Sequence, residues 1–305
     1  MLSFPEVNSS ADLEQGEMQA AKWTAPDGEI LYLRYAYTYP IETAIWEPYL
    51  IHRLFTTYWW ICFIITGVYI ATIYGLRQWM RDRKPFELRW PLVAWNAFLA
   101  VFSTVASIRF GEEALYVLLH ASERQGICYS IDPAGPAALW AFLFAISKVA
   151  ELVDTIFIVL RKRPLIFLHW YHHAVVLVYS WHAATELTAA GRYFIFMNYC
   201  VHSIMYTYYA LVSYGFRVPR RIAAAVTILQ TAQMLIGVLL SCRVAYIKFA
   251  KPELACQQSV ENLAICFFIY LTFAVLFTHY FYQSYIDGEK SRSRTAKEAA
   301  TKKIE

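Results

Sequence analysis

The chain has 305 residues, of which 58% are hydrophobic and only 16% are charged, and its mean hydropathy is +0.36. Soluble domains carry more charge and less apolar surface, so these values exclude an ordinary soluble protein and indicate a multi-pass membrane protein. The formal net charge is +4, but the basic residues lie in short loops between apolar segments. This distribution argues against nucleic-acid binding, which needs a basic face.

The apolar segments predict an all-α membrane protein with seven transmembrane helices. Residues 1–55 form a flank, whose first twenty residues lack the apolar core of a signal peptide. The stretch 112–122 is too short to span and predicts an interfacial or re-entrant helix, and 286–305 form a basic tail, which leaves 56–285 as the membrane domain. We expect the spans near 56–76, 90–110, 136–160, 165–184, 191–214, 222–247 and 260–283.

The distribution of basic residues predicts the orientation of these helices. The loops on one side, together with the C-terminal tail, hold 17 Lys and Arg residues, and the other side holds 9 over a much longer stretch of chain. The positive-inside rule places the richer side in the cytosol, so the C-terminus is cytosolic and the N-terminus lumenal.

Two short signals agree with this orientation. Asn8-Ser9-Ser10 is a glycosylation sequon, which is used only on the lumenal side, although such triplets also arise by chance. The final residues Lys302-Lys303-Ile304-Glu305 resemble the dilysine signal that returns membrane proteins to the endoplasmic reticulum, and the alternative is a solvated basic tail. We therefore expect a glycoprotein of the endoplasmic reticulum membrane.

The six cysteines show no metal-ligand spacing. Cys128 and Cys256 both fall in loops predicted to be lumenal, where the environment is oxidising, so we expect them to form a disulfide. Cys242 is an alternative partner for Cys128, and free thiols are a third possibility.

Polar side chains inside membrane spans are candidates for function. In the third span, Lys148, Glu151 and Asp154 are spaced by three residues and form a slanted polar stripe. An ion pair between Lys148 and Glu151 that fixes helix packing is the simplest interpretation, although both are also candidates for substrate binding. Asp154 is the better candidate to orient a histidine or contact the substrate.

The fourth span contains His169, His172 and His173, whose helical spacing directs them into the bundle together. On the fifth span, Asn198, His202 and Tyr206 share one face, and the first two need hydrogen-bond partners in a dry site. The sixth span adds further amides, which serve either the site or helix packing. These are Gln230 and Gln233. The sequence therefore predicts a single polar chamber near the cytosolic side.

The histidine cluster is compatible with two chemistries, metal binding and acyl transfer by an imidazole. Membrane desaturases and hydroxylases bind two irons with His-x-x-His-His motifs, but they need further histidine boxes, and this chain has 8 histidines in all. A single metal held by His169, His173 and Asp154 is a minor alternative. Without a metal, an imidazole can accept an acyl group from a thioester and pass it on. A receptor or transporter is a further alternative, against which the single chamber and the lack of an internal repeat argue.

Four motifs, "KVAELVDT", "HWYHH", "HSIMYTYY" and "TILQTAQ", occur in that order on consecutive spans. They resemble the signature boxes of the ELO family of very-long-chain fatty acid elongases, over about residues 50–285. The resemblance implies seven helices, six of them in an inverted barrel around a buried acyl tunnel. It also implies a 3-oxoacyl-CoA synthase, which condenses acyl-CoA with malonyl-CoA in a decarboxylative Claisen reaction without a further cofactor.

The resemblance and the chemistry together assign provisional roles. His172 would accept the acyl group, and His202 would act as a base or stabilise the enolate, with His169 and His173 positioning them. Asn198, Gln230 and Gln233 would donate hydrogen bonds to the thioester carbonyl or the CoA arm. The basic residues at the cytosolic mouth would bind the CoA phosphates, besides their part in topology. These are Arg161, Lys162, Arg163, Arg217, Arg220 and Arg221. Reductases and a dehydratase of the elongation cycle would be partners.

Overall fold

A computed structural model describes residues 20–24, 30–34, 38–133, 135–250 and 256–287, and helices dominate this part of the chain. A helix occupies each of the seven segments expected to span. The long elements are α3 (Ile61–Trp79), α4 (Arg89–His120), α6 (Pro136–Ala150), α7 (Val153–Leu160), α8 (Phe167–Glu186), α9 (Gly191–Tyr214), α10 (Arg220–Ala250) and α11 (Val260–Phe281), which runs into a π-helical turn, η1 (Tyr282–Asp287).

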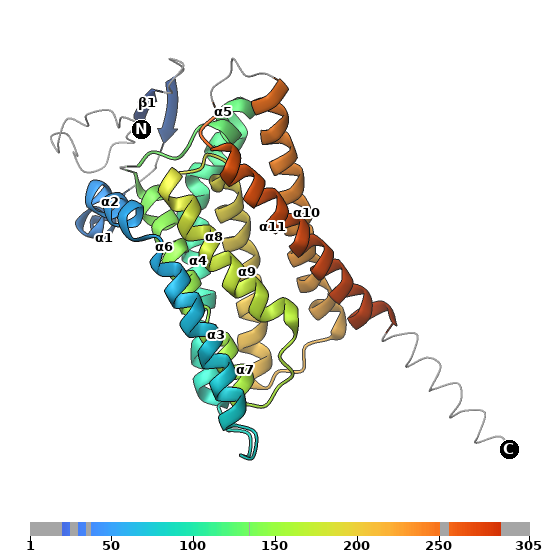
Figure 1. Cartoon of the computed structure of the whole chain (residues 1–305). Helices are drawn as coiled ribbons and strands as arrows, with labels where there is room; N and C mark the ends of the chain where they lie inside the picture. The colour runs from blue at the N-terminus through green and yellow to red at the C-terminus, as the bar shows by residue number, and fades with distance from the viewer. Residues whose placement is uncertain (1–19, 25–29, 35–37, 134, 251–255, 288–305) are drawn as a thin grey trace.

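Six helical rods form a closed ring, in which α6 and α7 together count as one rod. Going round it, α4 contacts α6, α6 contacts α8, α8 contacts α11, α11 contacts α10, α10 contacts α9, and α9 contacts α4 again (Figure 1). Helix α3 lies outside the ring, against α7 and α8. This arrangement agrees with the barrel that the family resemblance implied, and it encloses the space in which the candidate site lies.

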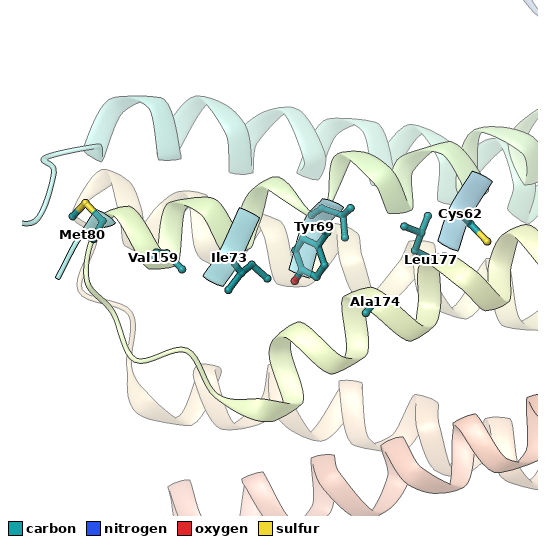
Figure 2. Close-up of a cluster of buried hydrophobic side chains, with 8 residues drawn as sticks. Cys62, Tyr69, Ile73, Met80, Val159, Ala174 and Leu177 are labelled. Atoms are coloured by element: carbon teal, nitrogen blue, oxygen red, sulfur yellow. The ribbon is translucent and has the colours of Figure 1, made fainter. Parts of the chain in front are cut away.

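Helix α3 is attached to the ring by apolar packing. Along α3, Cys62, Tyr69 and Ile73 are buried and face Val159 of α7 and Leu177 of α8 (Figure 2). These three α3 positions recur at intervals of seven and four residues, which is the spacing of one helical face. The opposite face of α3 exposes large apolar side chains, among them Phe63, Ile64 and Val68, as expected of a surface that meets lipid.

The third expected span, 136–160, is interrupted in the structure. It consists of α6 and α7, joined at Glu151 and Leu152 by bonds between residues three apart, from the Asp154 N–H to the Glu151 carbonyl and from the Thr155 N–H to the Leu152 carbonyl. Such 3₁₀ turns within a helix are tighter than α-helical turns and are frequent at functional sites. Beyond the turn, Asp154 bonds Trp95 and Tyr206, whereas Lys148 and Glu151 bond each other.

The observed length of α4 contradicts a second prediction, which concerned the segment 112–122. The segment 112–122 was expected to be a separate interfacial or re-entrant helix, but α4 continues without a break to His120, and a short helix, α5 (Glu123–Cys128), follows. The prediction took this stretch by itself, as too short to span, whereas it continues the second expected span. Within it, the fully buried carboxylate of Glu113 accepts a bond of 2.8 Å from Arg192 of α9, which neutralises it.

Arg192 organises what we call the α5 end of the bundle, where α5 and the connections 129–135, 187–190 and 256–259 lie. Besides pairing with Glu113, it donates to the carbonyls of Gly126, Tyr129 and Ser130 at 2.8–3.1 Å. A disulfide between Cys128 and Cys256 joins the same region to the start of α11, as the sequence predicted, and Cys242 is a free thiol.

The N-terminal flank contains structure that the sequence did not predict. Strands β1 (Ala20–Thr24) and β2 (Ile30–Arg34) pair as an antiparallel hairpin, and helices α1 (Pro40–Ile45) and α2 (Pro48–Tyr58) follow at the α5 end (Figure 1). The expected boundary between residues 55 and 56 therefore falls inside α2. Asn8 of the sequon and the dilysine-like Lys302 and Lys303 lie outside the described residues.

Length and composition alone identify four membrane-spanning helices in the described part of the chain. They are Ile61–Trp79, Arg89–His120, Arg220–Ala250 and Val260–Asp287. An all-α membrane domain follows from them. The rods formed by α6 with α7, by α8 and by α9 carry the polar residues of the candidate site, and the total of seven spans stays a prediction.

Candidate active site

Two adjoining cavities lie inside the ring. The larger, about 730 Å³, is mostly apolar and extends to the α5 end, where α2 and the loop around Pro133 line it. The smaller, about 150 Å³, is lined by most of the polar residues that the sequence singled out. Four residues line both cavities and so mark the junction between them. They are His172, Asn198, Gln233 and Met234.

Three of the four histidines of α8, His169, His172 and His173, line the smaller cavity, as their spacing predicted. His169 Nε2 lies 3.0 Å from the Thr155 hydroxyl, which in turn bonds Tyr69 of α3 at 2.7 Å. His173 packs between the other two, with ring-centre distances of 4.5 Å to His169 and 5.5 Å to His172. His169 is therefore positioned by its hydrogen bond with Thr155, and His173 is positioned by packing against His169 and His172.

His172 differs from its neighbours in being the histidine of this cluster that reaches both cavities. Its ring lies 4.9 Å from that of Phe273 and 5.9 Å from that of Phe277, both on α11. Among the described residues, no side chain forms a hydrogen bond with either of its ring nitrogens. An imidazole placed in this way is orientated by apolar contacts and keeps a nitrogen available for a reacting carbonyl.

A closed cycle of polar contacts joins two residues of the smaller cavity's wall to two residues behind it. Lys148 Nζ donates to Glu151 Oε1 at 2.7 Å and to Asn198 Oδ1 at 2.8 Å. Asn198 Nδ2 lies 3.2 Å from His202 Nε2, and His202 Nδ1 lies 3.5 Å from Glu151 Oε1, which closes the cycle. All four residues are buried. The ion pair between Lys148 and Glu151 is the one that the sequence suggested, and neither residue lines a cavity.

This cycle selects one tautomer of His202. A lysine ammonium only donates hydrogen bonds, so the Asn198 oxygen must face Lys148 and the Asn198 amide nitrogen must face His202. His202 Nε2 therefore accepts, and the ring proton resides on Nδ1, directed toward the Glu151 carboxylate. Lys148 thus orients His202 through Asn198, and Glu151 does so directly.

Asp154 does not orient a histidine, contrary to one of its expected roles. Its two carboxylate oxygens accept hydrogen bonds of 2.7 Å each, from Trp95 of α4 and from Tyr206 of α9. It still lines the smaller cavity, together with Tyr206. Trp95, Thr155 and Tyr69 are site residues that the sequence did not single out. Thr155 follows Asp154 within the third-span motif and is the one that a closer reading of the sequence would have found.

The two glutamines of α10 are used differently. Gln230 donates to the sulfur of Met205 at 3.0 Å and lines only the smaller cavity. Gln233 is 4% exposed and lies at the junction, and its amide forms no hydrogen bond with another described side chain. Gln233 is therefore the better placed of the two to donate to a substrate carbonyl at the junction.

The basic residues expected at the site mouth lie apart from both cavities. Lys162 and Arg220 donate to backbone carbonyls, of Arg81 and Ser284 respectively, and the other four lie close to them in the sequence without lining either cavity. Their contact with CoA phosphates therefore stays a prediction. Cys200 of α9 also lines neither cavity. Within the described ranges, no group of three His, Cys, Asp or Glu side chains is arranged to hold a metal ion.

Comparison with known proteins agrees with the motifs. The family model described as "ELO: GNS1/SUR4 family" matches residues 54–293. The chain is 45% identical to putative fatty acid elongase 4 of Caenorhabditis elegans over 264 residues, which cover 87% of this chain and 90% of that protein. It is 44% identical to human very long chain fatty acid elongase 6 over 230 residues, 75% of this chain and 85% of the relative. The corresponding chicken elongase 6 is 43% identical over 238 residues, 77% and 88% of the two chains. On these grounds the chain belongs to the ELO family of fatty acid elongases.

Proposed function

We propose that this protein is a 3-oxoacyl-CoA synthase of fatty acid elongation that carries the growing acyl chain on His172. Its relatives are named fatty acid elongases, and ELO proteins are the condensing enzymes of that process. The observation that carries the proposal is the position of His172 at the junction of an apolar and a polar cavity. A thioester whose tail enters the larger cavity would bring its carbonyl carbon to this imidazole.

The first half-reaction is acyl transfer. A nitrogen of His172 attacks the thioester carbonyl, the C–S bond breaks, and the CoA thiolate leaves with the proton that the imidazole loses. The amide of Gln233, at the same junction, is placed to donate to the carbonyl oxygen while it bears negative charge. The product is an acyl-imidazole, which remains activated because imidazole is a good leaving group.

The second half-reaction is condensation. Malonyl-CoA loses carbon dioxide to give an enolate, whose carbon attacks the acyl carbonyl, and the C–N bond to His172 breaks. His202, with its orientation fixed by Asn198 and Glu151, lies in the smaller cavity where this charge develops. Because its only N–H faces Glu151, we assign His202 to holding Asn198, whose second amide hydrogen can be donated to the enolate oxygen, with no cofactor beyond the two CoA thioesters. The 3-oxo product then requires a reductase, a dehydratase and a second reductase to become a saturated chain.

Trapping the acyl-enzyme tests this mechanism. Purified protein is incubated with acyl-CoA alone, and the peptide containing His172 is analysed by mass spectrometry. We expect one acyl group per chain on His172, release of one free CoA, and neither in the His172→Ala variant. Acylation of Cys200, or full condensation by His172→Ala with radiolabelled malonyl-CoA, would refute the assignment. Stoichiometric iron whose removal abolishes activity would instead support the oxygenase alternative.

For the location we propose the endoplasmic reticulum membrane, with a lumenal N-terminus and the α5 end toward the lumen. The Cys128–Cys256 disulfide at that end supports this orientation, because disulfides persist in an oxidising compartment. The bias in basic loops and the dilysine-like tail support it as well. Glycosidase treatment is a direct test: loss of one glycan from the wild type, and none from Asn8→Gln, is expected, and an unglycosylated wild type would count against the sequon.

A further inference from the structure

The α1–α2 segment, Pro40–Tyr58, closes the larger cavity at the α5 end. Trp46, Ile51 and Phe55 of this segment line the cavity, whereas Leu50 and Leu54 on the opposite face of α2 are 57% and 46% exposed. Helix α2 thus has one face toward the cavity and an apolar face turned outward. It forms a wall between the cavity and the surroundings of the bundle.

Aromatic contacts press α2 against the ring. The Phe55 ring lies 5.4 Å from that of Phe142 on α6 and 5.2 Å from that of Trp181 on α8. Just after α2, the Trp59 ring lies 5.2 Å from that of His182. Aromatic pairs at these separations contribute attraction beyond the area they bury. Phe55 therefore has a defined position at the cavity surface.

A buried ion pair holds α1 in place. Arg109 of α4 donates to both carboxylate oxygens of Glu42, at 2.9 and 2.7 Å, and Trp140 of α6 donates to one of them at 2.9 Å. Burial of the Glu42 carboxylate opposes ionisation, but the hydrogen bonds from Arg109 and Trp140 outweigh it and hold its pKa below the usual value. The indole of Trp46 also donates to the Pro133 carbonyl at 3.0 Å.

The distance from His172 to the α1–α2 segment determines how far an acyl chain can extend before it meets that segment. Residues of α8 line the cavity from His172 to Ala184, a rise of about 18 Å at ~1.5 Å per residue. Trp181, which contacts Phe55, lies about 14 Å along the helix from His172 by the same rise. A tail attached at His172 and extending along α8 therefore meets the α1–α2 segment after a long aliphatic stretch.

From these contacts we propose that the α1–α2 segment limits the length of the acyl chain that the enzyme elongates, with Phe55 as the contact for the chain end. The Glu42–Arg109 pair holds this wall in place. The inference rests on the proposed function, because it takes His172 as the point where the acyl group is attached. It assigns a role in substrate selection to the N-terminal flank.

The test compares two adjacent residues on opposite faces of α2, Phe55 and Leu54. Full-length protein is assayed with radiolabelled malonyl-CoA and a series of saturated acyl-CoA primers, and the ratio of the rates for long and short primers is recorded. This ratio does not depend on how much of each variant is folded. Phe55→Ala is expected to shift it by about tenfold toward longer primers, since one or two methylenes in an apolar pocket are worth that much. Leu54→Ala is expected to leave it unchanged.

A larger side chain should act in the opposite direction. Phe55→Trp is expected to lower the ratio and shorten the longest primer used. If both Phe55 variants keep the wild-type ratio while elongation proceeds, the length-limiting role is refuted and the proposed function stands. If the wild type elongates no primer in the series, the proposed function itself fails.

A second pair of variants tests whether the Glu42–Arg109 ion pair keeps α1 in place. Glu42→Gln weakens the bond from Arg109 to α1, whereas Glu112→Gln weakens a bond of 2.5 Å that the same arginine makes within α4. We expect Glu42→Gln to broaden the primer profile toward longer chains and Glu112→Gln to leave it as in the wild type. An equal effect of the two substitutions, or none from either, would show that the ion pair does not hold the wall.

Discussion

Replacing Lys148 with methionine separates a structural role for this residue from a chemical one. Lys148 is 3% exposed and its ammonium neutralises the equally buried Glu151. Methionine of similar length leaves the carboxylate with the Ser147 hydroxyl at 3.3 Å and His202 Nδ1 at 3.5 Å, and without a full positive charge. Removing one member of a buried ion pair typically costs about 3–5 kcal/mol. We expect a loss of that size in the free energy of unfolding.

Thermal unfolding of the detergent-purified protein measures this loss. At roughly 2–4 °C per kcal/mol for a chain of a few hundred residues, the unfolding temperature should fall by about 10 °C. The double variant Lys148→Met/Glu151→Gln should recover much of it, because no charge is then left unpaired. The exposed Arg243–Glu123 pair provides the control, and Arg243→Met should change the temperature little. A Lys148→Met protein that unfolds like the wild type yet makes no product would refute the structural role and place Lys148 in the chemistry.

Three further predictions concern the site and its surroundings. His172→Ala should lower condensation by at least a thousandfold with an unchanged unfolding temperature, whereas His182→Ala, outside the smaller cavity, should retain activity; both are measured with radiolabelled malonyl-CoA. Replacing Cys128 and Cys256 together by serine should lower the free energy of unfolding by about 2–4 kcal/mol, because the disulfide closes a sequence separation of 128 residues. A reducing agent should lower the free energy of unfolding of the wild type by the same amount and leave that of the double variant unchanged. Tyr206→Phe should lower that free energy by about 1–3 kcal/mol by leaving one Asp154 oxygen unbonded, and an unchanged unfolding curve would mean that Trp95 suffices to hold Asp154.

The sequence predicted the elements whose signals are local. Runs of apolar residues located the long helices, and the helical spacing of His169, His172 and His173 placed all three at one cavity. Asn198 and His202, one turn apart on α9, were likewise predicted to face the site. In each case the prediction needed only the geometry of a single helix.

The contacts that the sequence did not predict join residues far apart in the chain. Trp95 reaches Asp154 across 59 positions, and Glu42 reaches Arg109 across 67. Nothing in a single sequence signals such a pair, and the second span was accordingly expected to end near residue 110 without these contacts. For the same reason the N-terminal flank was given no role, since α2 lines a cavity only after α6 and α8 have packed beside it.

The sizes of the two cavities bear on the order of the reaction. The larger, about 730 Å³, is within the roughly 300–1,000 Å³ of ligand-binding pockets, but the smaller, about 150 Å³, is well below that range. On the proposed function, we expect the smaller cavity to hold the reacting end of one CoA thioester at a time. The first CoA would then leave before malonyl-CoA enters, while the acyl group stays attached to His172 at the junction. Such an acyl-imidazole would let one small polar cavity serve both substrates in turn.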